Sequence, residues 1–207
     1  MDTPSPDHDR LGVDVDRHRY QDLASFRLPP GFRGRSAVVT QLWWLTQALL
    51  FHPSPQFMYG WRRFLVRLFG AKIGADVLLR PSVRVTYPWK LEIGDRSWIG
   101  DRVELYTLGP IRIGSDAVVS QDSYLCTGSH DRTDPAFSMV TAPVVVEDQA
   151  WIAAGVFIAP GVTIGRGAFV GVRSVVLRDI AAGMEAVGSP ARAIRRRAVK
   201  RADYPSS

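Results

Sequence analysis

Aliphatic residues recur every six positions along the C-terminal two thirds of the chain. A period of six is neither the 3.6 of a helix nor the alternation of a half-buried strand. It predicts an all-β solenoid in which three short strands make one turn and every sixth side chain points inward. The repeating positions are all Ile, Leu or Val: Ile73, Leu79, Val85, Ile93, Ile99, Leu105, Ile113, Val119, Leu125, Val146, Ile152, Ile158, Ile164, Val170 and Val176.

The starting points of the repeats set the number of coils. Successive turns begin at residues 73, 93, 113, 146 and 164, which indicates about five coils over residues 73–182. Two of these steps are longer than eighteen residues by two, so we expect two-residue corner insertions before Ile93 and Ile113.

The period breaks between Leu125 and Val146, where the chain becomes polar and rich in turn residues. We therefore expect a loop at 126–145 that leaves the solenoid. Long loops on a rigid scaffold commonly carry function. This loop contains His130, the only histidine of the repeat region.

The residues before the repeats divide into a polar arm and a helical cap. The polar residues 1–36, with their prolines and glycines, predict an arm with little regular structure. Residues 37–72 predict two helices that cover the apolar end of the first coil. The cap also predicts a peripheral contact with the inner membrane surface, because it combines tryptophans and arginines that suit an interface. These are Trp43, Trp44, Trp61, Arg62, Arg63 and Arg67.

The second of these helices has its own start signal. Ser54 is the expected N-cap and Pro55 the first helical residue, and the helix is expected to end near Phe69, before Gly70. Its expected apolar face consists of Phe57, Trp61, Phe64, Leu65 and Leu68.

Charge is concentrated at the C-terminal end. The net charge is +6, and the segment 192–201, within the basic segment 183–207, has six cations and no acidic residue, so residues 192–201 alone account for the excess. No helix-turn-helix or zinc-finger spacing presents these cations, so we predict no nucleic-acid partner.

The remaining composition points to the cytoplasm. The single cysteine, Cys126, cannot form an internal disulfide, and the N-terminus lacks the pattern of a signal peptide. The longest apolar stretch, residues 37–51, is interrupted by polar residues and is too short to span a bilayer.

Several segments are similar to one enzyme family. The repeated Ile-Gly units resemble the hexapeptide-repeat acyltransferases, which fold as a left-handed parallel β-helix. Longer segments resemble the colanic acid biosynthesis acetyltransferases, which acetylate sugars of an exopolysaccharide intermediate. These segments are Gln41-Leu42-Trp43-Trp44, Arg67-Leu68-Phe69-Gly70-Ala71-Lys72-Ile73-Gly74, Tyr87-Pro88-Trp89-Lys90-Leu91 and Leu125-Cys126-Thr127-Gly128-Ser129-His130-Asp131.

The resemblance implies a homotrimer that binds acetyl-CoA between neighbouring solenoids and uses one histidine as general base. The matching residue is His130, and a neutral imidazole can accept the proton of a sugar hydroxyl near pH 7. His8, His18 and His52 lie outside the matching segment. Zinc chemistry on such a solenoid needs several histidines in the repeats, so no metal is expected.

The resemblance also implies donor contacts. Ala154 and Val172 match positions whose backbone faces the pantetheine arm, and Arg178 follows the last full repeat. Arg192 and Arg195 lie in a segment that resembles the closing segment of the family, and guanidinium groups suit the phosphates. A solvated basic tail is the alternative interpretation.

The acceptor contacts are less well specified. Related sugar acetyltransferases have an asparagine where this chain has Glu104, Leu105 and Tyr106, and we assign Tyr106 to substrate binding. Either Glu104 or Asp131 could orient His130 through its second nitrogen. Trp43, Trp44 and Trp89 could stack on a sugar or pack in the protein.

Three functions remain open from the sequence. The first is an O-acetyltransferase that acts on a saccharide, either free or carried on a lipid diphosphate. The second is an N-acetyltransferase or other acyltransferase that acts on a nucleotide or amino sugar. The third is an inactive solenoid scaffold, although such a scaffold would not need a histidine on a protruding loop.

Overall fold

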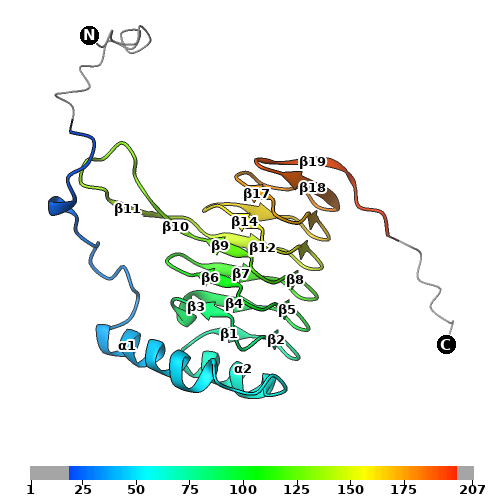
Figure 1. Ribbon diagram of the computed structural model, residues 1–207, viewed down its shortest axis with the longest axis horizontal. Coiled ribbons are helices and arrows are strands. Elements are labelled where there is room, and N and C mark those ends of the chain that lie inside the picture. Colours follow the sequence, from blue (N-terminus) through cyan, green and yellow to red (C-terminus); the bar gives the residue numbers. More distant parts are fainter. Residues whose placement is uncertain (1–18, 200–207) are drawn as a thin grey trace, which may run out of the picture. The chain divides into compact units, whose positions relative to one another are not determined.

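The computed structural model describes residues 19–199 (Figure 1). The chain forms two compact units, one with the residues up to Pro29 and His130–Val140, the other with Pro30–Ser129 and the residues from Thr141 onward. The predictions for residues 1–18 and 200–207, including His8 and His18, lie outside the described residues.

The larger unit contains a parallel β-solenoid whose strands form three sheets. The first sheet consists of β1 (Lys72–Ile73), β4 (Leu91–Ile93), β7 (Ile111–Ile113), β12 (Val144–Val146) and β15 (Thr163–Ile164). The second consists of β2 (Leu78–Leu79), β5 (Trp98–Ile99), β8 (Val118–Val119), β13 (Trp151–Ile152), β16 (Phe169–Val170), β18 (Met184–Gly188) and β19 (Ala191–Arg196). The third consists of β3 (Arg84–Val85), β6 (Glu104–Tyr106), β9 (Tyr124–Cys126), β14 (Phe157–Ile158) and β17 (Val175–Val176).

The six-residue period is the register of this solenoid. All fifteen repeating positions are buried, and none is more than 8% exposed. Ile73 pairs with Ile93 and Ile93 with Ile113, which confirms the twenty-residue steps. Part of a sixth coil follows, because Ile180 bridges to Ile164. The predicted solenoid is confirmed, with about six turns rather than about five.

The corners explain the small residues of the repeat. A Cβ atom added to Gly94 would lie 2.5 Å from the amide nitrogen of Ser115 in the next coil. No side chain fits at that separation, so the coil spacing requires glycine there.

The helical cap lies across the end of the solenoid next to β1 and β2 (Figure 1). It consists of α1 (Ala37–Thr46), the π-helical η3 (Gln47–Phe51) and α2 (Tyr59–Leu68). Ser36 accepts a hydrogen bond from the amide of Val39 and caps α1. The buried Trp43 donates its indole N–H to the carbonyl of Val85, 2.8 Å away, which ties α1 to the first coil.

The predicted start of α2 is wrong. The helix begins at Tyr59, and Ser54 does not cap it, because the Ser54 hydroxyl donates to Phe51 and accepts from Arg62. The predicted apolar face is also wrong, because Phe57, Phe64 and Leu68 are exposed.

Arginines take the place of that apolar face. Arg62 is fully buried and donates to the carbonyls of Leu79, Pro55 and Gln56. Arg67 donates to Ile73 in the first coil. The guanidinium groups thus satisfy backbone carbonyls at the end of the solenoid.

Short helical segments and one small sheet complete the described residues: η2 (Leu23–Ser25), η4 (Pro88–Lys90), and β10 (Gly128–His130) paired with β11 (Met139–Thr141). Both β10 and β11 belong to the loop predicted between β9 and β12.

Candidate active site

His130 is held in one tautomer by the loop that carries it. Its Nδ1 atom lies 2.6 Å from the carbonyl oxygen of Phe137. A carbonyl oxygen can only accept, so Nδ1 donates its proton and the neutral ring keeps its lone pair on Nε2. Nε2 is therefore the nitrogen that can act as a base.

Two aromatic rings fix the plane of the imidazole. The Phe137 ring stacks on it with the centroids 3.8 Å apart, and the Phe26 ring lies 5.9 Å away at a tilt of 60°. Phe26 belongs to the N-terminal arm, which also joins the loop through a hydrogen bond from the amide of Asp22 to the carbonyl of Pro135. Neither phenylalanine could be assigned from the sequence, because Phe26 is about a hundred residues from His130 and Phe137 lies in an irregular loop without a repeating pattern.

Asp131 has a different partner from the one expected. Its carboxylate accepts from the amide and the hydroxyl of Thr133, at 2.8 and 2.6 Å. These hydrogen bonds lower the pKa of Asp131 and close a turn in the loop. In the structure, Nδ1 of His130 bonds to the carbonyl of Phe137, and the hydrogen bonds of the Asp131 carboxylate go to Thr133.

Glu104 and Tyr106 lie on β6 in the larger unit. Glu104 pairs with Arg84 of the preceding coil, with Nε and Oε2 3.4 Å apart. Burial raises the pKa of Glu104 and also that of Tyr106. Both residues face a groove of about 880 Å³ between the helical cap and the first coils, and its other lining residues include Trp44, Gln47, Ala48, His52, Arg84, Thr86 and Asp101.

The three tryptophans that could stack on a sugar, Trp43, Trp44 and Trp89, differ in how accessible their rings are. Trp43 is fully buried and cannot reach a ligand. Trp89 stacks on Tyr87 with the ring centroids 5.2 Å apart. Trp44 is 40% exposed and lines the groove, so its ring is available for a sugar.

Two of the predicted donor residues lie at one corner of the solenoid, and a third lies next to it. Ala154 and Val172 occupy the corner between the second and third sheets in successive coils, because Ile152 pairs with Val170. The antiparallel pairing of β18 with β19 places Arg192 opposite Val187, one position away from the column of Ala154 and Val172. Val172 is 65% exposed, so this corner is open to a ligand.

The other two donor residues lie elsewhere. Arg178 is exposed and follows β17, at the corner that leads from the third sheet to the first. Arg195 forms an ion pair with Glu185, with Nε and Oε2 2.6 Å apart. The structure therefore groups Arg192 with the open corner and separates Arg178 and Arg195 from it.

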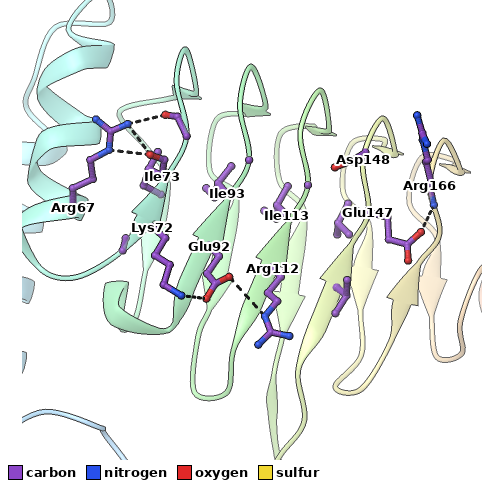
Figure 2. Close-up of a pocket in the computed structure, with 16 residues that line it drawn as sticks. Arg67, Lys72, Ile73, Glu92, Ile93, Arg112, Ile113, Glu147, Asp148 and Arg166 are labelled. Atoms are coloured by element: carbon purple, nitrogen blue, oxygen red, sulfur yellow. Dashed lines mark hydrogen bonds and ion pairs between the residues drawn. The ribbon is translucent and has the colours of Figure 1, made fainter.

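A second hollow, of about 740 Å³, lies along the first sheet and contains none of the predicted site residues. Figure 2 shows that charged side chains of successive coils pair along it. Glu92 contacts Lys72 at 2.8 Å and Arg112 at 3.8 Å. These pairs join one coil to the next on a solvent-facing surface.

Two absences concern residues 19–199. No group of three His, Cys, Asp or Glu side chains in this part of the chain could hold a metal ion. Within the same residues, no helix is long and apolar enough to cross a membrane.

Comparison with known proteins decides the family. No family model matches the chain. A protein of Escherichia coli K12 that is named as a colanic acid biosynthesis acetyltransferase, WcaF, is 55% identical over 177 residues, which are 86% of this chain and 97% of that protein. The chain belongs to the colanic acid biosynthesis acetyltransferases. The prediction of an acetyl-CoA-dependent acetyltransferase is thereby confirmed, together with the acetyl coenzyme A complex described next.

More distant relatives agree with this assignment. The galactoside O-acetyltransferase of Escherichia coli K12 is 28% identical over 65% of this chain and 68% of its own. A hexapeptide-repeat acetyltransferase of Vibrio cholerae, solved with acetyl coenzyme A, is 28% identical with a TM-score of 0.71, and the match covers 79% of this acetyltransferase and 91% of that one.

Proposed function

We propose that this acetyltransferase moves the acetyl group of acetyl-CoA to a hydroxyl of an exopolysaccharide intermediate, with Nε2 of His130 as the general base. The observation that carries this role is the hydrogen bond from Nδ1 to Phe137, because it leaves the lone pair on Nε2. A sugar hydroxyl is a poor nucleophile at neutral pH and needs such a base.

The proposed reaction proceeds by direct transfer. Nε2 of His130 accepts the hydroxyl proton while the sugar oxygen forms a bond to the acetyl carbon. The carbon–sulfur bond breaks, and the imidazolium returns the proton to the departing sulfur. The carbonyl of Phe137 stabilises the imidazolium, because it accepts the Nδ1 proton throughout. No covalent enzyme intermediate is needed.

The open corner is proposed to bind the donor. The corner at the half-buried Ala154 and the exposed Val172 suits a pantetheine arm, and Arg192 next to it suits a phosphate. Arg178 and Arg195 are proposed as further phosphate contacts. Arg195 can take that role only by leaving Glu185, so we expect it to contribute less than Arg192.

The groove beside β6 is proposed to bind the acceptor. Trp44 offers an exposed ring for stacking on a sugar, and the carboxylate of Glu104 and the hydroxyl of Tyr106 offer hydrogen bonds. Arg84 adds a cation that suits the phosphate of a lipid-diphosphate carrier. These features favour a lipid-linked saccharide as the acceptor.

The outer faces of the solenoid support a homotrimer as part of the proposal. The first sheet presents charged Lys72, Glu92 and Arg112 outward. The second sheet presents the apolar Trp98 and Trp151, which are 56% and 42% exposed. Exposed apolar columns of this kind are typical of subunit interfaces. We also propose that the enzyme works in the cytoplasm, in peripheral contact with the inner face of the membrane.

The direct test uses purified enzyme with isotope-labelled acetyl-CoA and candidate acceptors, analysed by mass spectrometry. Oligosaccharides of the exopolysaccharide, free and lipid-linked, should gain one labelled acetyl group that mild alkali removes as an ester. His130→Ala should abolish the product above background. Transfer only to an amino or nucleotide sugar, in an alkali-stable amide, would identify an N-acetyltransferase. No transfer to any acceptor would favour the scaffold function.

A further inference from the structure

The helical cap exposes an apolar stripe on the side opposite the solenoid. Val38, Leu42, Leu45 and Leu49 follow one another at steps of four, three and four residues, so they share one face of α1 and η3. Their exposed fractions are 68%, 51%, 55% and 62%. We call these four residues the outer apolar face.

The other side of the same helix is already occupied. Thr40 and Trp43 are fully buried, and the indole of Trp43 binds the carbonyl of Val85 in the first coil. The helix α1 is therefore apolar on two sides, and packing against the solenoid accounts for only one of them.

The rest of the cap adds to this exposed apolar surface. The indole of Trp61 in α2 donates to the carbonyl of Leu50 in η3, so these two elements are neighbours. Exposed side chains on these elements and the connection between them include Leu50, Phe57, Phe64 and Leu68. A monomeric protein rarely exposes so many large apolar groups in one substructure unless something binds there.

The charge of the segment indicates what binds. Between residues 23 and 75 the sequence has no Asp or Glu, but it has seven cations: Arg27, Arg33, Arg35, Arg62, Arg63, Arg67 and Lys72. The guanidinium of Arg63 donates to the carbonyl of Val77, and that of Arg67 to the carbonyls of Ile73 and Gly74, which leaves their positive charge in place. Arg62 is fully buried, so the other six cations carry the surface charge. An apolar helical face in a segment with several cations and no acidic residue is typical of helices that lie in the plane of an anionic bilayer.

We propose that the outer apolar face of α1 and η3 inserts into the surface of an anionic lipid bilayer. This inference deepens the peripheral membrane contact of the proposed function and rests on it for its biological purpose. Trp44 and Ala48 of the same helical segment line the acceptor groove. Binding of the outer apolar face to lipid therefore holds that groove close to the membrane, where a lipid-linked saccharide presents its sugar.

The test is flotation of the full chain with vesicles of phosphatidylcholine, with and without phosphatidylglycerol. The wild type should float with the anionic vesicles and less with the neutral ones, and added salt should weaken its binding. Leu45→Gln/Leu49→Gln should lower the vesicle partition coefficient at least tenfold, and Val38→Gln/Leu42→Gln should act in the same direction. Leu177→Gln is the matched control, because Leu177 is 54% exposed but lies on the solenoid, and it should bind vesicles like the wild type.

The thermal midpoint and the turnover of each variant distinguish a loss of membrane binding from a loss of folding or of catalysis. All variants should keep the thermal midpoint and the turnover of the wild type on a water-soluble acceptor. A lost vesicle interaction with intact turnover supports the membrane face. Intact vesicle binding without any acetyl transfer would contradict the proposed function alone. Equal vesicle binding by both double variants and the wild type would overturn the inference. A change in the oligomeric mass of the double variants would also overturn it, because the outer apolar face would then be a contact between protein chains.

Discussion

The solenoid and the loop around His130 are held by different kinds of interaction. Inward side chains of the solenoid are aliphatic, buried and repeated from coil to coil, so each one contacts many neighbours. The loop is held by a few directed contacts, such as those of Phe137 with the imidazole and of Thr133 with Asp131. Substitutions in the solenoid should therefore lower stability, whereas those in the loop should lower turnover.

The largest stability effect should come from Ile158→Ala. Ile158 is fully buried and pairs with Leu125 and Val176 in the coils on either side. Removing its side-chain atoms should lower the free energy of unfolding by about 2 to 5 kcal/mol, measured by urea denaturation. Turnover per folded molecule should stay unchanged. Val145→Ala, at a half-buried outward position, should cost less than about 1 kcal/mol. Equal losses from the two variants would contradict the role of the inward positions.

Substitutions of Arg192 and Arg195, on the surface of the solenoid, should change donor binding rather than stability. Arg192→Ala should raise the KM for acetyl-CoA about tenfold with kcat less changed, because a charge-assisted contact to phosphate contributes about 1.5 kcal/mol or more. Arg195→Ala should raise it less, since its guanidinium already pairs with Glu185. An unchanged KM in both variants would assign both arginines to a solvated basic segment.

The smallest effect concerns Glu104 and pH. Burial raises the pKa of Glu104 in the folded protein, so the folded state binds this proton more tightly than the unfolded chain does. The wild type should therefore lose stability relative to Glu104→Gln as the pH rises from about 4 through the folded-state pKa. The difference in thermal midpoint should change by less than about 4 °C. If the stability of the wild type instead rises relative to that of Glu104→Gln over this pH range, the ion pair with Arg84 has a larger effect on the pKa of Glu104 than burial has.

The solenoid could be predicted from the sequence because its interactions are periodic. Each inward residue from Ile73 to Val176 repeats the same environment, so the spacing alone fixes the coils and the corner insertions. The loop could be predicted as an interruption of that period. The partial coil at Ile180 was missed, because Ile180 follows its partner Ile164 by sixteen residues rather than eighteen and so falls outside the six-residue period.

The helical cap and the surroundings of His130 could not be predicted in the same way. From the sequence, Arg62 is expected at the surface. In the fold, backbone carbonyls at the end of the solenoid accept hydrogen bonds from its guanidinium and make its burial favourable. The guanidinium of Arg62 also donates a hydrogen bond to the Ser54 hydroxyl, so Ser54 does not act as the expected N-cap. Phe26 reaches His130 from the other end of the sequence, and Phe137 acts through its backbone carbonyl, which any residue possesses.

The central claim is that Nε2 of His130 is the base, and kcat of His130→Asn at saturating acetyl-CoA and acceptor tests it most directly. Asparagine keeps the approximate shape of the side chain but has no basic nitrogen. We expect kcat to fall by roughly 10²- to 10⁴-fold, the usual contribution of a positioned base, with the thermal midpoint and oligomeric mass of the wild type. A variant with those wild-type physical properties that retains more than about a tenth of the wild-type kcat would contradict the claim.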